Sequence, residues 1–543
     1  MRIALPDRLG RRTGTTSPDG SVQRVVVIGG GIAGLATAAL LASRGHSVDL
    51  VEKNHDLGGR VGSVERGGFR FDTGASWYLM PEVFEHFFSL LGTTADAELD
   101  LTVLDPSYRV FFEGHDESID VRPDRAHNRA LFESLEPGAG ERFDAYLRSA
   151  EETYDMALRR FLYSNFDAAS SFLHPDVVRS TPRLSRLLTR SLESHVAASF
   201  SDNRLRQVLG YPAVFLGSSP SRAPSMYHLM SRLDLGDSVL YPQGGFTRLI
   251  EVIAALAERH GARLHTGCEA TAIVTDGSGG GRGSRARVTG VEHLDASGDR
   301  VVLPADVVVG AADLHHLETA LLPTALQTHP ERVWRDRSPG PGAVLAMLGV
   351  EGALPELPHH SLFFTSDWQQ NFGDIFGKDA RVPEPASVYV CKPSETDPTV
   401  APAGHENLFV LVPVPADTRI GRGGDDGAGS EQVERTADAA IAQVARWSGV
   451  HDLADRVVVR HTVGPEDFEA RYHSWRGGAL GLEHTLRQSA FLRPGNTSAK
   501  VDGLLYAGST TVPGVGLPMC LISAELVLKR LTGDRSAQPV GGR

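Results

Sequence analysis

Apolar positions near the amino terminus form two short β-branched runs separated by one longer run of small residues. Residues 25–28 are typical of a strand buried on both faces of a parallel sheet, and residues 47–51 resume that character. Between them, residues 35–44 place leucine and alanine at helical spacing, and Gly45 ends the segment. The pattern predicts a strand–helix–strand unit.

Other short apolar runs extend this picture along the chain. Strands are predicted at residues 263–265, 301–303, 305–311 and 504–507, and a helix at residues 519–531. Two glycine-rich stretches predict flexible loops, at residues 277–285 and 421–430.

The turn after the first strand carries glycines at a spacing with a physical use. Gly29 makes a tight turn, Gly31 lets the backbone approach a pyrophosphate, and Gly34 lets the helix lie close to the strand. The helix then directs its free N–H groups at the phosphates, and Glu52 ends the second strand, where an acid accepts the ribose hydroxyls. The unit predicts dinucleotide binding; the alternative is a glycine-rich turn in an ordinary α/β domain.

Composition and charge restrict the class of protein. With 41% hydrophobic and 22% charged residues over 543 positions, the chain has the composition of a folded protein of two or more domains. The formal net charge of −13 argues against a nucleic-acid binder, because phosphate recognition needs a basic face. The cysteines are few and far apart, which predicts a reducing compartment and neither a disulfide framework nor a zinc or other metal site: Cys268, Cys391 and Cys520.

The sequence predicts that the protein contacts the surface of a membrane and does not span it. Residues 1–20 lack the apolar core of a signal peptide and predict a flexible leader, and no run of about 18 apolar residues occurs. Residues 177–200 contain no acid before Glu193, and a helix predicted to start after Pro182 repeats arginine at positions 183, 186 and 190. Such a basic amphipathic helix suits anionic headgroups; the alternative is a solvated charged face.

The residues after Glu52 distinguish FAD from NAD. Gly58, Gly59 and Arg60 form a second tight turn carrying a cation, followed by the string DTGASW from Asp72. Taken together these residues resemble the second fingerprint of the FAD-dependent amine oxidase and carotenoid desaturase group. Without the two glycines before it, Arg60 would be interpreted as a member of a surface salt bridge.

Four segments resemble bacterial phytoene desaturases in particular, and in the same order. They are residues 72–88, 241–246, 478–494 and 503–531. One departure is Thr510-Thr511-Val512, where many members of that family read Gly-Thr-His before Pro-Gly.

The resemblance implies an α/β fold: a Rossmann-like FAD-binding domain with a mixed-sheet and helical substrate- and membrane-associating domain. The expected division is a leader at 1–23, an FAD-binding domain from 24–95, 241–320 and 480–535, a substrate region from 96–240 and 321–479, and a flexible tail at 536–543. The expected FAD-binding residues are Gly29, Gly31, Ala33, Gly34, Glu52, Lys53, Gly59, Arg60, Gly508, Ser509, Val515, Gly516 and Leu517.

The resemblance also implies an FAD-dependent desaturase, with phytoene as the first candidate substrate. A hydride would pass to flavin N5, the electrons would go on to oxygen or a quinone, and the protein would lie in the cytoplasm, peripherally on the membrane. Asp176 and Arg179 match an Asp-x-x-Arg element and are candidate acid–base or charge-stabilising residues, or else a surface pair. The alternatives are a carotene ketolase or isomerase, an amine or protoporphyrinogen oxidase, and a non-enzymatic prenyl-protein escort of the GDI type.

Overall fold

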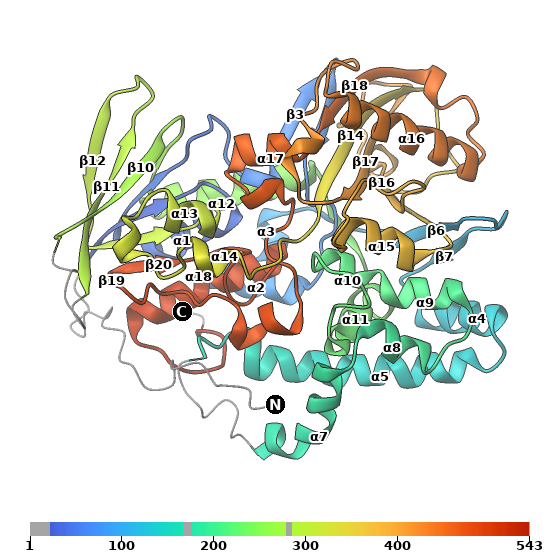
Figure 1. Ribbon diagram of the computed structural model, residues 1–543, viewed down its shortest axis with the longest axis horizontal. Helices are drawn as coiled ribbons and strands as arrows, with labels where there is room; N and C mark the ends of the chain where they lie inside the picture. Colours follow the sequence, from blue (N-terminus) through green and yellow to red (C-terminus); the bar gives the residue numbers. More distant parts are fainter. Residues whose placement is uncertain (1–21, 167–174, 278–284, 542–543) are drawn as a thin grey trace.

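The predicted strand–helix–strand unit is present in a computed structural model, which describes residues 22–166, 175–277 and 285–541. It consists of β1 (Arg24–Ile28), α1 (Ile32–Ser43) and β2 (Ser47–Val51) (Figure 1). Nearly all of the leader and most of the predicted loop at 277–285 lie outside the described residues.

This unit lies in a parallel five-stranded sheet with the order β20-β13-β1-β2-β9. The added strands are β9 (Arg263–His265), β13 (Val307–Gly310) and β20 (Leu504–Tyr506). All three were expected from the sequence as strands. Because they come from distant parts of the chain, the sheet joins the amino-terminal turn to the carboxyl-terminal segment; the domain boundaries themselves stay a prediction.

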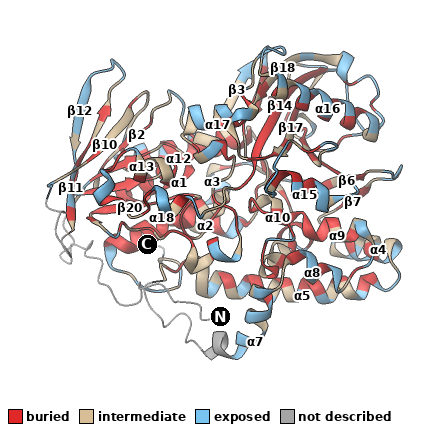
Figure 2. Ribbon diagram, viewed as in Figure 1, coloured by how far each residue is buried: buried red, intermediate tan, exposed pale blue. Residues whose placement is uncertain are grey.

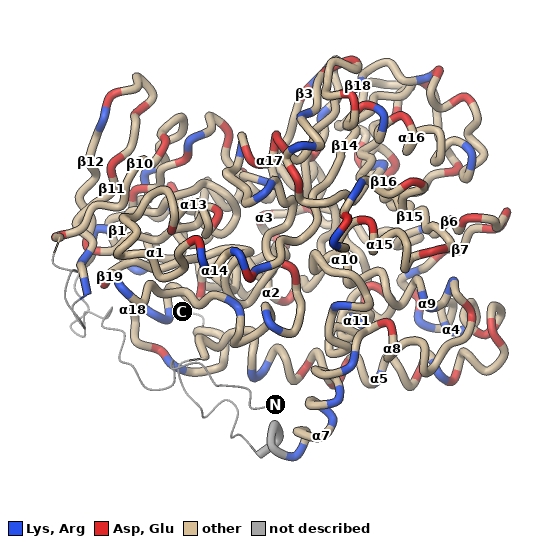
Figure 3. Tube along the Cα trace, viewed as in Figure 1, with Lys and Arg blue, Asp and Glu red and all other residues tan. Residues whose placement is uncertain are grey.

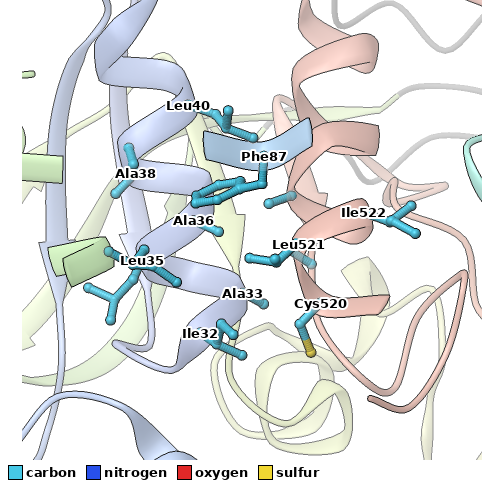
Figure 4. Packing of buried hydrophobic residues seen from close by; sticks show 14 of the residues in the cluster. Ile32, Ala33, Leu35, Ala36, Ala38, Leu40, Phe87, Cys520, Leu521 and Ile522 are labelled. Carbon is cyan, nitrogen blue, oxygen red and sulfur yellow. The ribbon is translucent and has the colours of Figure 1, made fainter. Parts of the chain in front are cut away.

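Helices cover one face of this sheet and a second sheet covers the other. On the helical side, α1 packs against α12 (Gly245–Arg259) and α18 (Leu517–Thr532). Phe87 of α2 (Pro81–Leu90) lies with α1 and α18 in the same apolar cluster (Figure 4). On the other side, β1 and β13 share a core with β10 (Glu269–Thr275) and β11 (Ala286–Leu294). Strand β11 pairs with β10, with β12 (Arg300–Pro304) and with β19 (Val501–Asp502).

A seven-stranded mixed sheet forms the other half of the molecule. Its order is β18 (Val457–Val463), β14 (Gly342–Glu351), β17 (His405–Val414), β16 (Val388–Cys391), β15 (His360–Phe364), β6 (Tyr108–Phe112) and β7 (Ile119–Val121). Helix α16 (Glu431–Ser448) packs on one face of its centre, and the hairpin of β3 (Ser63–Arg66) and β4 (Phe69–Asp72) packs on the other. Figure 2 shows β14 buried, as a strand covered on both faces should be.

Helices fill the space below that sheet in Figure 1. They include α4 (Arg125–Leu135), α5 (Ala139–Ala157), α7 (Pro175–Thr189), α8 (Leu192–Ala197) and α9 (Asn203–Gly210). The structure also contains the helices α3 (Ala95–Glu98), α10 (Pro212–Phe215), α11 (Ser231–Leu235), α13 (Leu314–Thr319), α14 (Glu331–Trp334), α15 (Trp368–Phe376) and α17 (Pro465–Tyr472). None of the helices in the described part of the chain has the length and apolar content needed to cross a bilayer.

The predicted helix start after Pro182 is wrong, because α7 begins at Pro175 and continues through Pro182. Proline is favoured in the first turn of a helix, whereas an interior proline costs one backbone hydrogen bond. Packing offsets that cost: Arg183 donates from Nη2 to the Ser149 carbonyl oxygen on α5 at 2.8 Å, and Leu187 is buried.

Two segments expected to be flexible are held by hydrogen bonds to polar side chains. In the loop at 421–430, the Gly423 N–H donates to Asp467 at 2.7 Å, and the Gly424 N–H donates to Thr462 Oγ1 at 2.9 Å. In the tail, the buried Lys529 ammonium donates to the carbonyl oxygens of residues 536 and 538 at 2.6 and 2.8 Å. A buried ammonium needs acceptors, so the chain after α18 folds back to supply them.

Candidate active site

The turn between β1 and α1 has the geometry that its glycines predict. Gly29 has a φ of +105°, a conformation that favours glycine, and its N–H donates to the Val51 carbonyl oxygen at 2.8 Å. A Cβ on Gly34 would lie 1.9 Å from the Gly29 carbonyl oxygen. Only glycine therefore lets α1 start this close to the strand.

The start of α1, at Gly31, faces open space. A Cβ on Gly31 would meet only the Gly58 carbonyl oxygen within 4 Å, at 3.9 Å. Gly31 is the N-cap of α1 and brings no side-chain acceptor to the first N–H groups. A helix start with free N–H groups, a positive dipole end and open space in front suits a pyrophosphate. The turn thus fits the phosphates of a dinucleotide.

Glu52 is fixed beside this turn. It is buried and accepts hydrogen bonds from the Gly30 N–H at 2.7 Å and the Asn54 N–H at 2.8 Å. Its carboxylate therefore ties the end of β2 to the phosphate turn, next to the expected ribose. Lys53, also expected at the cofactor, points elsewhere: its Nζ donates to the Ala470 carbonyl oxygen at 2.6 Å.

We expect Glu52→Gln to weaken FAD binding by roughly 1.5–3 kcal/mol, because hydrogen bonds to a charged acceptor are lost and an amide N–H is turned toward a backbone N–H. FAD titration of the apoprotein, followed by flavin fluorescence, measures this. Glu65→Gln, at an exposed position on β3, is the control and should bind as the wild type does. Equal affinity in the two variants would contradict the role given to Glu52.

The second glycine turn packs on the first. The Gly58 N–H donates to the Gly30 carbonyl oxygen at 2.8 Å, and a Cβ on Gly59 would lie 3.3 Å from Gly31 Cα. Arg60 crosses to the carboxyl-terminal part of the chain, donating to Ser509 Oγ at 3.2 Å and to the Ala479 carbonyl oxygen at 3.1 Å. The structure therefore brings together Gly59, Arg60 and Ser509, which the sequence analysis expects to bind FAD; that they bind it stays a prediction.

The loop from Gly508 to Gly516 closes the site. A Cβ on Gly508 would lie 3.7 Å from Ala33 Cβ on α1, so this loop meets the phosphate-binding helix. Gly516, at φ +124°, caps α18, which starts at Leu517, two residues after the buried Val515. The N-terminus of α18 would stabilise negative charge on a reduced ring if the ring lies next to it, as the sequence analysis expects.

Arg493 holds this loop, a role that the sequence analysis missed. Its buried guanidinium donates to four carbonyl oxygens, those of Leu482, Gln488, Ser509 and Thr511, at 2.5 to 3.2 Å. Burial lowers its pKa to about 10, so it stays charged at neutral pH. The Arg-Pro pair at residues 493–494 could have indicated this role. It is part of the resemblance to bacterial phytoene desaturases, but the resemblance assigns no function to it.

Glu483 and His484 lie at the seam between the two halves. Glu483 accepts from Arg222 at 2.7 Å and from Ser218 at 2.9 Å. His484 Nδ1 lies 2.8 Å from the Leu216 carbonyl oxygen, and burial lowers its pKa well below the usual value. Both are satisfied polar residues that join distant segments.

The structure describes only part of the candidate acid–base pair. Asp176 lies in α7, but its side chain falls outside the described residues, and Arg179 on the same helix is exposed. The roles proposed for them from the resemblance stay a prediction.

A buried carboxyl lies among aromatic rings in the other half of the molecule. Asp234 Oδ2 accepts from the hydroxyls of Tyr108 at 2.9 Å and Tyr211 at 2.7 Å. Trp77, from the DTGASW string, packs on both rings and on Phe215. Burial raises the pKa of Asp234 to about 7.

Asp234 should make stability depend on pH. Between about pH 4 and about pH 7 the folded protein keeps a proton that the unfolded chain has lost, so the free energy of unfolding falls as pH rises through that window. Asp234→Asn removes this titration. We expect the free energy of unfolding of the wild type, measured by thermal unfolding, to fall by a few kcal/mol relative to that of Asp234→Asn across this pH window and to fall no further above it. The exposed Asp336→Asn is the control. A constant difference between wild type and Asp234→Asn would contradict the raised pKa.

Comparison with known proteins agrees with this geometry. The profile described as flavin containing amine oxidoreductase matches residues 32–528. The chain belongs to this family. FAD is therefore its cofactor, and the chain is an FAD-dependent oxidoreductase.

Individual relatives indicate which group within this family the chain resembles. The chain is 41% identical over 516 residues to a carotenoid 3,4-desaturase of Haloarcula japonica, covering 95% of this chain and 99% of the relative. It is 34% identical to a zeta-carotene-forming phytoene desaturase of Myxococcus xanthus, covering 95% of each. An oxidoreductase structure from Methanosarcina mazei shares the fold, with a TM-score of 0.59 at 16% identity over 93% of this chain and all of that one. The resemblance to the carotenoid desaturase group is confirmed.

Proposed function

We propose that this flavoprotein is a carotenoid desaturase, which converts a CH–CH bond of a long polyene into a double bond. The observation that carries the proposal is the 41% identity to a carotenoid 3,4-desaturase over nearly the whole of both chains. The two glycine turns and the Gly508–Gly516 loop support it, since they fit the cofactor that such a reaction needs.

Two substrates are candidates. The sequence resemblance favours phytoene, and a phytoene desaturase is among the relatives. The higher identity to the 3,4-desaturase favours a longer-conjugated carotenoid with a saturated 3,4 bond. Both are hydrocarbon chains that are bound by apolar burial, at roughly 25 cal/mol per Å².

In the reaction, one carbon loses a hydride and its neighbour loses a proton, so the substrate gives up two electrons. Bound FAD supplies the hydride acceptor. The chain's part is to hold the ring, through Arg60, Ser509 and the loop fixed by Arg493, to present the N-terminus of α18 to the charge that develops, and to exclude water. Because the polyene stabilises an allylic cation itself, few polar side chains are needed. Oxygen or a quinone would reoxidise the protein.

We infer that the substrate enters from a membrane surface and that α7 faces it. Helix α7 projects at the edge of the molecule and carries a row of basic residues (Figures 1 and 3). Arg179 and Arg186 are exposed on it, whereas Arg183 pairs with Glu152 on α5. Two exposed arginines on this helix suit anionic headgroups.

Expression in bacteria that accumulate phytoene, and in bacteria that accumulate a carotenoid saturated at the 3,4 bond, tests the proposal. Extracted pigment should gain absorption at longer wavelength in one of the two strains, and chromatography should show the loss of two hydrogens per step. A ketone or a geometric isomer would indicate one of the alternative enzymes. Protein purified without flavin would indicate an escort.

A further inference from the structure

Two histidines and a cysteine meet in the seven-stranded sheet. His360 begins β15 and Cys391 ends β16, and the antiparallel register pairs these two residues directly. His359 precedes His360. One ring nitrogen of each histidine and the Cys391 sulfur all lie within 4.8 Å of one another. The three side chains are buried, at 2%, 0% and 4% exposure for His359, His360 and Cys391.

The histidines are oriented but incompletely satisfied. His359 Nδ1 lies 2.8 Å from Thr396 Oγ1, and His360 Nδ1 lies 2.9 Å from the Tyr389 hydroxyl. The Nε2 atoms of both rings are buried and have no hydrogen-bond partner among the described residues. A buried polar atom without a partner costs free energy and calls for an explanation. Outer hydrogen bonds that fix one ring nitrogen are also the usual support of a metal-binding imidazole.

Burial lowers the pKa of both histidines, and the charge of Lys392 lowers that of His359 further, whereas Asp397 raises it. Lys392 lies nearby, but its ammonium is paired with Glu395 at 2.5 Å and donates to the Leu354 carbonyl oxygen at 2.8 Å. Without a cation, burial raises the pKa of the Cys391 thiol. A bound metal reverses that preference by stabilising the thiolate.

We propose that His359, His360 and Cys391 bind one zinc ion. One thiolate with two imidazoles is a ligand set that zinc accepts, and a water molecule would complete four-coordination. Binding expels the Cys391 thiol proton, so each ion taken up releases one proton. This differs from the sequence prediction of no metal site, because only the strand register brings the three residues together.

The site has a structural task. Trp77 stacks on His360 with ring centroids 4.6 Å apart, and Tyr241 packs on His359 at 4.6 Å. Both aromatic residues come from segments that lead to or from the cofactor half. A metal that fixes the two histidines would therefore fasten the sheet to these segments and take no part in hydride transfer.

Metal analysis of the FAD-loaded protein, purified without a metal-chelating column, tests the proposal. We expect about one zinc per chain in the wild type and at least a tenfold drop in Cys391→Ser. The control is Cys268→Ser, at another buried free cysteine, which should keep its zinc. FAD content and circular dichroism establish that each variant is folded. Full zinc content in folded Cys391→Ser would overturn the assignment.

A second measurement covers the case in which Cys391→Ser fails to fold. X-ray absorption at the zinc edge of the wild type should show one sulfur and two imidazole nitrogens in the first shell. Wild-type protein that contains no zinc and takes up none when refolded with it would overturn the proposal, as would a first shell without sulfur or a different metal at these ligands.

Discussion

Gly31→Val should yield folded protein that retains no FAD. A Cβ at this position has only one neighbour within 4 Å, the Gly58 carbonyl oxygen, so the valine fits the protein itself. Its methyl groups would instead fill the space in front of the first N–H groups of α1, where the pyrophosphate is expected. Absorbance of the purified protein in the flavin region, normalised to protein, measures the loss.

The matched control is Gly373→Val, in α15. A Cβ there meets nothing within 4 Å and the residue is helical, so only a small change in helix propensity is expected, of the order of 0.5 kcal/mol or less and in favour of valine. This variant should carry as much flavin as the wild type. Retention of flavin by Gly31→Val would mean that the β1–α1 turn does not hold the phosphates.

Arg493→Met should destabilise the protein by about 3 kcal/mol or more, because four buried carbonyl oxygens lose their donor together. Two of these oxygens belong to Ser509 and Thr511 in the loop that closes the cofactor site. The variant should therefore lose flavin as well as thermal stability. The midpoint of thermal unfolding and the flavin content are measured on the same sample.

Two further variants separate charge from hydrogen bonding. Arg487→Met, at an exposed position six residues earlier, should leave both quantities unchanged. Arg493→Lys keeps the charge with fewer donors and should fall between the wild type and Arg493→Met. An unchanged thermal midpoint in Arg493→Met would contradict the role given to this guanidinium.

Local patterns were enough to predict the cofactor half of the fold. The strand–helix–strand unit could be predicted because the need for glycine in the turn from Gly29 to Gly34 depends only on residues close by in the sequence. The same is true of β13 and β20, two of the strands that complete the parallel sheet, whose apolar runs are continuous. The helix at the carboxyl terminus was also predicted, starting two residues late because Leu517 and Pro518 belong to its first turn.

Features that depend on residues far apart in the sequence could not be predicted from local patterns. The loop at 421–430 looked flexible from its glycines, but it is fixed by Thr462 and Asp467 from later segments. Helix α7 passes through Pro182 because contacts with α5 outweigh the local cost. Arg493 and the cluster of His359, His360 and Cys391 likewise gain their environments only from tertiary contacts.

The claim on which the rest depends is that bound flavin receives a hydride from a polyene. The direct test mixes the purified, FAD-loaded protein with phytoene, and separately with a carotenoid saturated at the 3,4 bond, in liposomes without oxygen. The account predicts that the absorbance of oxidised flavin disappears with one of the two substrates, with one new carbon–carbon double bond formed per flavin reduced. Flavin that stays oxidised with both substrates, with no desaturated product, would contradict it.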